Sequence, residues 1–230
     1  MKNTDVRRER EARRRQGYRE VILHAAERVI CRKGFSALTM NDVAREAQLS
    51  KATVYKYIAG KGVLLFEILA HYFDDMAGRV DEVLAGPGTA VEKLRLAIRL
   101  IIQEQESKSY VTRILWMDKA MLKLMHVYVE AGGKPGSMPA ADRKRVAVLQ
   151  GKMERIAQMA SRIFEEGVAS GEFRALDARR ASVFMQAVVE GYAHNRFWGG
   201  DGPLSPDAVD VLTQFILEGI RNPEPAGKEK

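Results

Sequence analysis

A short segment near residue 50 carries cations and a phenol on one side and aliphatic groups on the other. It has the sequence LSKATVYKYIAGK over residues 49–61. If the segment is helical, Val54 and Ile58 are four residues apart and share one face. The opposite face then presents the polar and small side chains Lys51, Ala52, Tyr55 and Lys56. Amines neutralise phosphates and phenol hydroxyls donate to them, so the pattern is typical of a helix that contacts a nucleic acid.

The basic charge of the chain is concentrated in its first quarter. The 230 residues include 37 Lys/Arg and 30 Asp/Glu, a net charge of +7. Residues 1–61 hold 15 Lys/Arg and 7 Asp/Glu, a net +8, whereas residues 62–230 have a net charge of −1. A basic module on a nearly neutral body favours a polyanionic partner, either nucleic acid or an anionic membrane surface. The alternative is that the basic residues only keep the chain soluble.

Composition excludes several classes of protein. With 46% hydrophobic and 29% charged residues the chain is typical of globular proteins. No apolar run approaches the roughly 20 residues of a membrane span, and no signal peptide is recognisable. We therefore expect a cytoplasmic protein without a membrane partner.

Residues for metal or covalent chemistry are scattered. The one cysteine, Cys31, excludes an internal disulfide; it suits a small core position, or alternatively a redox sensor. The four histidines lack metal-ligand spacing, and no phosphate-binding glycine loop is present. We expect no metal, no cofactor and no enzymatic activity.

Helical periodicity dominates the chain, and no stretch of four or more residues alternates cleanly between apolar and polar. This predicts an all-α fold, with an N-terminal three-helix helix-turn-helix domain and a C-terminal helical bundle. The first helix is expected over residues 17–33, the second from residue 39, and the third over the segment quoted above. Further helices are expected at 61–84, 89–107, 109–131, 140–169, 177–197 and 206–221.

The second and third predicted helices have the outline of a helix-turn-helix. Thr39 and Asp42 have the spacing of a capping box, and Ser50 suits the N-cap of the third helix. Only Gln48 and Leu49 separate the two helices, so a tight turn joins them inside a basic unit. In that arrangement the third helix enters the major groove. The alternative is an ordinary amphipathic helix whose lysines are merely solvated.

Residues from about Ile22 to Leu69 resemble the DNA-binding domain of TetR-type (TetR/AcrR) transcriptional regulators. The matching residues are Ile22, Ala25, Ala26, Gly34, Leu38, Thr39, Met40, Asp42, Val43, Ala44, Ala47, Leu49, Ser50, Thr53, Val54, Tyr55, Lys61 and Leu64. A weaker similarity to AcrR-like members covers Gly167–Arg174, Asp177 and Gly191. The main departure is Gln48, where the family usually has glycine; a positive φ there would cost about 1 kcal/mol.

The resemblance implies the function and the contacts. It implies phosphate contacts at Thr39, Tyr55 and Lys61, and base-facing positions at Lys51, Ala52, Thr53 and Lys56, with Ser50 on the same face. It further implies a homodimer formed through 177–197 and 206–221, bound to a double-stranded DNA operator. The function expected is a ligand-responsive repressor released from a pseudo-palindromic operator by a small-molecule effector. The alternatives are an activator, a ligand-independent regulator, or a small-molecule-binding helical protein whose basic head meets another partner.

Four regions are expected. Residues 1–16 form a basic flexible arm, 17–62 the helix-turn-helix domain, 63–221 the ligand-binding and dimerisation domain, and 222–230 a polar tail. The arm either lies in the minor groove or is a solvated tail. Candidate pocket residues, with ordinary core packing as the alternative, are Trp116, Met117, Met121, Phe184, Val188 and Asn195.

Overall fold

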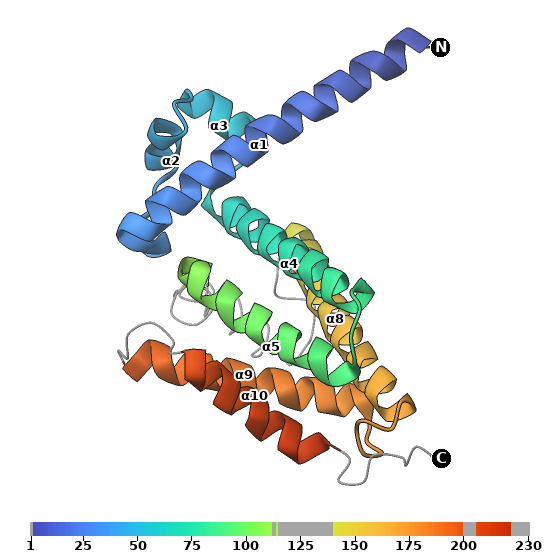
Figure 1. Ribbon diagram of the computed structural model, residues 1–230. Helices are drawn as coiled ribbons and strands as arrows, with labels where there is room; N and C mark the ends of the chain where they lie inside the picture. The colour runs from blue at the N-terminus through green and yellow to red at the C-terminus, as the bar shows by residue number, and fades with distance from the viewer. Residues whose placement is uncertain (1, 112–113, 115–139, 200–205, 222–230) are drawn as a thin grey trace. The chain divides into compact units, whose positions relative to one another are not determined.

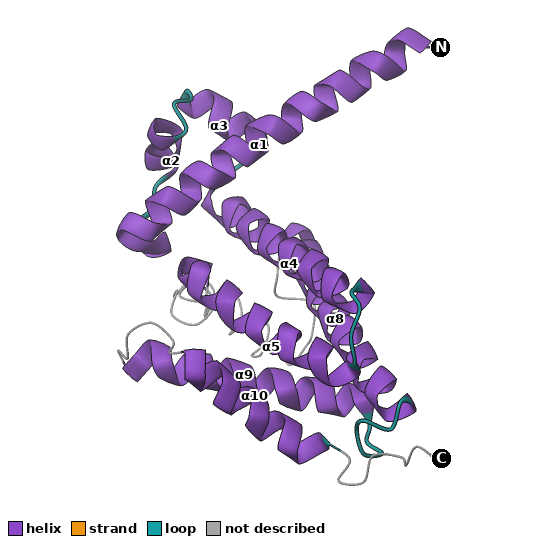
Figure 2. Ribbon diagram, viewed as in Figure 1, coloured by secondary structure: helices purple, strands orange, loops and turns teal. Residues whose placement is uncertain are grey.

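The chain folds into helices joined by short turns. The computed structural model describes residues 2–111, 114, 140–199 and 206–221 (Figure 1). Within them, pairing of the β type is limited to one bridge between Phe173 and Arg221. The helices are α1 (Lys2–Ala37), α2 (Met40–Glu46), α3 (Lys51–Tyr57), α4 (Lys61–Ala85), α5 (Ala90–Ser107), α8 (Ala140–Ala169), α9 (Ala178–Gly199) and α10 (Pro206–Ile220). For the described residues Figure 2 shows helix and loop only, which confirms the predicted all-α fold. None of the described helices is long and apolar enough to cross a membrane.

The helices fall into two compact units. One comprises Met1–His71 with Tyr110–Val146, and the other comprises Tyr72–Ser109 with Ala147–Lys230. The division falls within α4, whereas the sequence-based boundary lies at residue 62. The predicted helix over 109–131 lies largely outside the described residues.

Helices α1, α2 and α3 of the first unit pack against one another. Each contributes apolar side chains that are almost completely buried. These are Ile22, Ala26, Val29 and Ile30 of α1, Val43 of α2, Val54 of α3, and Ile58 directly after α3. Full burial of a Val or Ile side chain stabilises a fold by about 1.5–3 kcal/mol, so this small core holds the two short helices in place. The three-helix organisation predicted from the sequence is confirmed.

Helix α1 begins fifteen residues before the start expected from the sequence. Residues 2–16, predicted to be a flexible arm, are helical and continuous with the rest of α1. Their composition explains the difference, because Arg, Glu and Ala favour helix. A flexible arm was expected because this segment has no apolar face, but an exposed helix does not need one.

The other end of α1 is marked by glycine, as expected. Gly34 has φ 78° and ψ 161°, a conformation open to glycine and costly for other residues. Cys31, one turn earlier, is exposed and does not occupy the small core position favoured by the sequence analysis. Its neighbours Ile30 and Val29 take the buried positions of that turn.

The turn between α2 and α3 requires a residue with positive φ, and here that residue is Gln48 (φ 55°). The N–H of Gln48 donates to the Arg45 carbonyl at 3.1 Å, and the N–H of Leu49 donates to the Ala44 carbonyl at 2.9 Å. These are the paired bonds of a Schellman motif, whose left-handed position is usually glycine. Residue 48 is therefore in the left-handed conformation that usually requires glycine, and the hydrogen bonds of the turn form although Gln48 carries a side chain.

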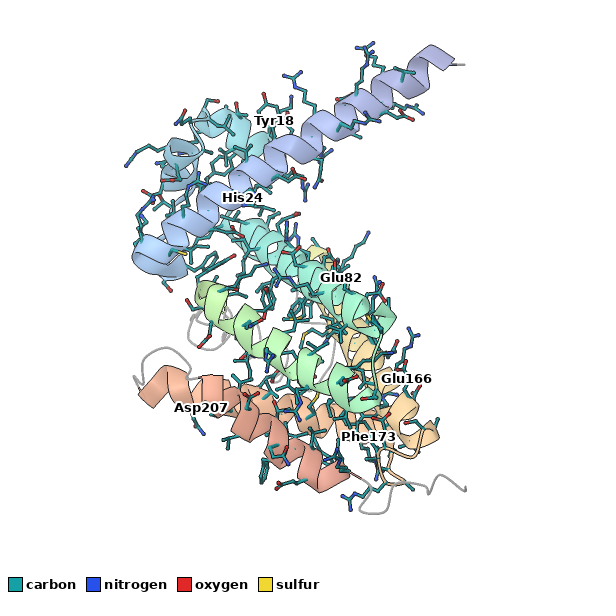
Figure 3. All side chains as sticks on the ribbon, in the orientation of Figure 1. Tyr18, His24, Glu82, Glu166, Phe173 and Asp207 are labelled. Atoms are coloured by element: carbon teal, nitrogen blue, oxygen red, sulfur yellow. The ribbon has the colours of Figure 1, made fainter. Side chains whose placement is uncertain are left out.

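In the second unit, the last turn of α8 packs directly against an aromatic ring. A Cβ on Gly167 would lie 2.1 Å from the ring of Phe173, so only glycine allows this ring to lie on the helix backbone. The next residue back, Glu172, accepts from the backbone N–H groups of Ala90 and Val91, at 3.2 Å each. The turn after α8 therefore caps the first turn of α5. Phe173 is labelled in Figure 3.

Replacement of Gln48 by glycine is expected to stabilise the first unit by up to about 1 kcal/mol, because glycine has no Cβ penalty at positive φ. The gain is partly offset by the greater freedom of glycine in the unfolded chain. Urea unfolding followed by circular dichroism measures the change. Gln48→Ala is the matched control and should show no gain, since alanine keeps the Cβ. Equal stability of the glycine variant and the parent would contradict the strain at this position.

Candidate nucleic-acid interface

Helix α3 turns its apolar residues inward and its polar residues outward. Val54 and Ile58 are 0% exposed. Tyr55 is 42% exposed, and Lys51 and Lys56 are also exposed. The exposed side therefore combines two amines and a phenol, with Ala52 exposed between them and Thr53 partly buried. This is the orientation predicted from the sequence; the DNA contacts themselves stay a prediction.

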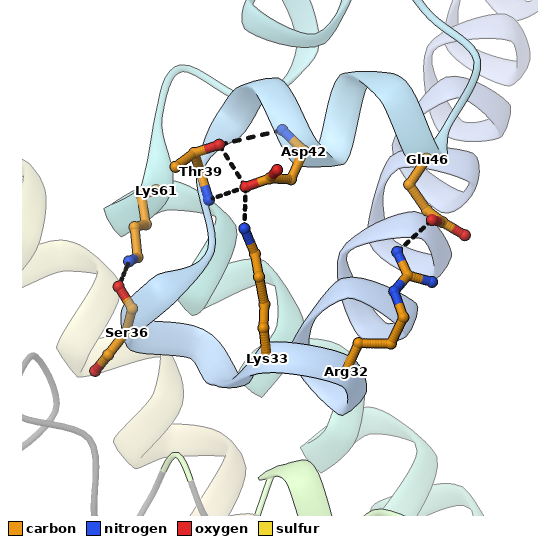
Figure 4. Close-up of polar contacts among 7 residues, drawn as sticks. All are labelled: Arg32, Lys33, Ser36, Thr39, Asp42, Glu46 and Lys61. Atoms are coloured by element: carbon orange, nitrogen blue, oxygen red, sulfur yellow. Dashed lines mark hydrogen bonds and ion pairs between the residues drawn. The ribbon is translucent and has the colours of Figure 1, made fainter.

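The hydroxyls nearest the two helix starts are engaged in capping. Ser50 Oγ accepts from the Thr53 N–H at 3.0 Å and lies 2.8 Å from the Thr53 hydroxyl oxygen. At the start of α2, Thr39 Oγ1 accepts from the Asp42 N–H at 3.2 Å, and the Thr39 N–H donates to the Asp42 carboxylate at 2.9 Å (Figure 4). The Thr39 hydroxyl also donates to that carboxylate. A phosphate contact by Thr39 thus requires its hydroxyl to turn away from Asp42.

Two carboxylates of α2 bind cations of α1. Asp42 pairs with Lys33, and this ammonium together with the hydrogen bonds from Thr39 holds the pKa of Asp42 well below its usual range. Glu46 pairs with Arg32 and with Arg28, whose Nε lies 2.6 Å from Glu46 Oε1. Hydrogen bonds from Arg32 and then Arg28 lower the pKa of Glu46 to about 2. Part of the basic charge in this unit therefore fixes α2 on α1.

Lys61, at the first position of α4, also has a structural contact. Its ammonium donates to the Ser36 carbonyl at 2.8 Å and lies 4.9 Å from the centre of the Phe35 ring (Figure 4). This contact joins the start of α4 to the last turn of α1. A phosphate contact at Lys61 would have to share the ammonium with this carbonyl.

Two tyrosines that the sequence analysis does not single out connect α1 to α3. The rings of Tyr18 and Tyr57 are stacked with centres 4.8 Å apart and planes 11° from parallel. The Arg14 guanidinium lies 5.7 Å from the Tyr18 ring, and the Lys56 ammonium lies 5.7 Å from the Tyr57 ring. The stack joins residues 39 positions apart in the sequence, so no local pattern predicts it. Figure 3 shows Tyr18 on α1, near α3.

The candidate pocket residues are not brought together by the described part of the structure. Trp116, Met117 and Met121 lie outside the described residues. On α9, Phe184 and Val188 are 67% and 36% exposed, and Asn195 is exposed. Met185 and Val189 occupy the buried side of α9 in the single chain instead, and the candidate pocket stays a prediction.

A buried carboxylate in the second unit is another residue that the sequence analysis missed. Glu104 of α5 is 3% exposed and pairs with Arg79, with the Lys108 ammonium 3.7 Å away. Burial, with the charge of Glu104, raises the pKa of the neighbouring Tyr72 hydroxyl to about 12.

Among the described residues no group of three or more His, Cys, Asp or Glu side chains is placed to hold a metal ion.

Comparison with known families assigns the helix-turn-helix region. The family described as "Bacterial regulatory proteins, tetR family" matches residues 22–68, from the first buried residue of α1 into α4. A 54-residue match, 37% identical, links 24% of the chain to 27% of the uncharacterized regulator YdeS of Bacillus subtilis.

Longer matches cover most of the chain at low identity. The transcriptional repressor KstR2 of Mycolicibacterium smegmatis is 22% identical over 88% of this chain and 90% of its own length. The regulator FadR from Bacillus subtilis, solved in complex with stearoyl-CoA, is 18% identical with a TM-score of 0.67 over 88% of this chain and 99% of FadR. A TetR/AcrR-family regulator from Thermobifida fusca is 22% identical with a TM-score of 0.62 over 89% and 98%. These solved structures share the fold of the chain.

The bridge from Glu46 to Arg28 and Arg32 should give stability a defined pH dependence. The pKa of Glu46 in the folded state is below its unfolded value of about 4.3, so the contribution is present above that pH and is lost as pH falls toward 2. Glu46→Gln should therefore lower the urea midpoint at pH 6, and its deficit relative to the parent should shrink between about pH 4.5 and 2. Glu9→Gln, on the exposed part of α1, is the control and should show no deficit. A Glu46→Gln deficit of the same size at pH 6 and pH 2.5 would contradict the assigned bridge.

Proposed function

We propose that this chain, a transcriptional regulator of the TetR family, is a repressor that binds a pseudo-palindromic operator as a homodimer and is released by a small-molecule effector. It would act in the cytoplasm, where its DNA partner lies. The observation that carries the proposal is the outward face of α3, where Lys51, Tyr55 and Lys56 surround the small Ala52.

The chemistry of this face suits the major groove of DNA. The groove is about 12 Å wide and admits a helix, and a small side chain such as Ala52 lets the backbone approach the base edges. In this proposal Lys51, Ala52, Thr53 and Lys56 meet bases. Tyr55 donates its hydroxyl to a phosphate. Thr39, Ser50 and Lys61 lie at the edges of the face, and their capping and carbonyl contacts make them secondary contributors.

Exposed apolar side chains on the last two described helices support dimerisation. Phe184 and Val188 are one turn apart on α9, and Val211 and Phe215 are one turn apart on α10, with exposures from 36% to 68%. On the α9 face, Gly191 continues the Phe184–Val188 row and has open space around it, so a second helix could approach closely. Exposed apolar faces of this kind mark association sites. Two copies joined here would present two α3 helices to successive half-sites about 34–36 Å apart.

The effector part of the proposal is supported by the shared fold. FadR from Bacillus subtilis has this fold and was solved with stearoyl-CoA, so acyl-CoA is the first ligand class to test for operator release. A ligand that favours a different spacing of the two α3 helices lowers DNA affinity, and by linkage DNA lowers the affinity for the ligand equally. A reporter assay with and without the protein separates repressor from activator.

Substitutions on α3 should separate general affinity from sequence preference. Tyr55→Ala is expected to weaken binding about tenfold on every duplex, because it removes a hydrogen bond to a charged group. Lys51→Ala is expected to change the ranking of operator variants, because that side chain faces bases. Gel shifts over a panel of operators measure both, and Arg155→Ala, an exposed arginine of α8, is the charge control. Unchanged affinity of Tyr55→Ala combined with Lys51→Ala would exclude this face.

The dimer should depend on the exposed phenylalanines. Phe184→Glu and Phe215→Glu should each shift the protein toward monomer in analytical ultracentrifugation, because a carboxylate would be buried unpaired in the interface. Val148→Glu replaces another exposed apolar residue, on α8, and should leave the dimer intact. Dissociation by Val148→Glu but not by the phenylalanine variants would place the interface elsewhere.

A further inference from the structure

The first fifteen described residues form a helical extension that lies outside the region matched by the family. Residues 2–16 include seven Lys/Arg and three Asp/Glu, a net charge of +4. All side chains from Val6 to Gln16 are exposed. The extension contrasts with the rest of α1, whose cations Arg19, Arg28, Arg32 and Lys33 are taken up by ion pairs.

Several cations of the extension have no acidic partner within the described residues. These are Arg7, Arg8, Arg10, Arg13 and Arg15. Unpaired arginines spaced along an exposed helix keep their full hydration and their full attraction for an anion. Acidic residues nearby are few, since Glu9 and Glu11 are the only ones between Val6 and Gln16.

Most of the arginines gather on one side of the helix. Steps of seven, four and four residues connect Arg7, Arg14, Tyr18 and Ile22 along this side, and Arg8 and Arg15 border the row on one flank. Ile22 is buried against the neighbouring helices and Tyr18 stacks on Tyr57 of α3, so this is the side of α1 that faces α3. Arg10 borders the row on its other flank, three residues after Arg7 and four before Arg14, whereas Arg13 points to the opposite side. Figure 1 shows the extension running on beyond α3.

The tyrosine stack holds the extension in a defined direction relative to α3. Arg14, Tyr18, Tyr57 and Lys56 follow one another as cation, ring, ring and cation, with each neighbouring pair between 4.8 and 5.7 Å apart. Lys56 belongs to the outward face of α3, while Arg14 belongs to the extension. These four side chains therefore join α3 to the extension through the stacked rings of Tyr18 and Tyr57.

We propose that the extension of α1 is a second DNA-binding element, whose α3-side arginines contact the phosphates that flank the half-site bound by α3. This inference rests on the proposed DNA-binding function. An α-helix is about 10–12 Å wide and the minor groove only about 6 Å, so the extension binds as a helix along the phosphates and not inside that groove. At a rise of 1.5 Å per residue, Arg7 lies roughly 16 Å beyond Tyr18, a distance of about five base pairs along the duplex.

Two charge-matched variants of the full-length protein test the proposal. Binding to the selected operator is measured by fluorescence anisotropy at several KCl concentrations, and the slope of log affinity against log salt is compared. Arg7→Gln should reduce the slope by about 0.9 per protomer, because about 0.9 is lost per phosphate contact. Arg13→Gln removes the same charge from the opposite face and should change the slope by less than half as much. Equal effects of the two substitutions, or no effect of Arg7→Gln, would overturn the proposal.

A helix-breaking variant tests whether the extension acts as a helix. Ala12→Pro interrupts the helix between Arg7 and Tyr18 and should reduce the slope toward that of the Arg7→Gln variant. An Ala12→Pro protein with the parent's slope would indicate an extended chain bound in the minor groove and would overturn the helical assignment. If the parent itself lacks sequence-selective binding, the proposed function fails; if the parent binds selectively and the Arg7→Gln variant is unchanged, only this inference fails.

Discussion

A helix of seven residues cannot persist in water by itself, and α3 has that length. Its position depends on the burial of Val54 and Ile58, both completely covered, and on the cap that Ser50 supplies at its first turn. The same burial determines which side of α3 faces outward. Because Val54 and Ile58 point inward, Lys51, Tyr55 and Lys56 on the opposite side of the helix lie at the surface. Stability and the proposed DNA contact are therefore two consequences of one packing arrangement.

The cations of the first unit have two separate uses. Arg28, Arg32, Lys33 and Lys61 bind carboxylates or a carbonyl and hold α1, α2 and the start of α4 together. The cations of α3 and the arginines between positions 7 and 15 of α1 make no ion pair among the described residues. A net charge alone does not distinguish these uses. The contacts do, because the paired cations join α1 to α2 and α4, and the unpaired ones lie on α3 and along the exposed extension of α1.

The sequence predicted the features that depend on neighbouring residues. The capping box at Thr39 and Asp42, the short turn and the ends of α4, α5 and α8 follow from local spacing, and the structure has them within one or two residues. The family resemblance added the positive φ expected at position 48. Contacts between distant residues were beyond local patterns: the Tyr18–Tyr57 stack, the Lys61 bond to Ser36 and the burial of Glu104 all join separate helices. The helix over residues 2–16 was not predicted for another reason. This segment has no apolar face, so only the helix propensity of its Arg, Glu and Ala residues indicates a helix.

The central claim is that the outward face of α3, presented twice by a dimer, reads DNA sequence. Selection of bound sequences from a pool of random duplexes tests this most directly. The account predicts an enriched motif of two inverted half-sites whose centres are one helical turn, or a multiple of one turn, apart. Recovery of duplexes with no shared motif, at an affinity that depends on salt alone, would contradict it.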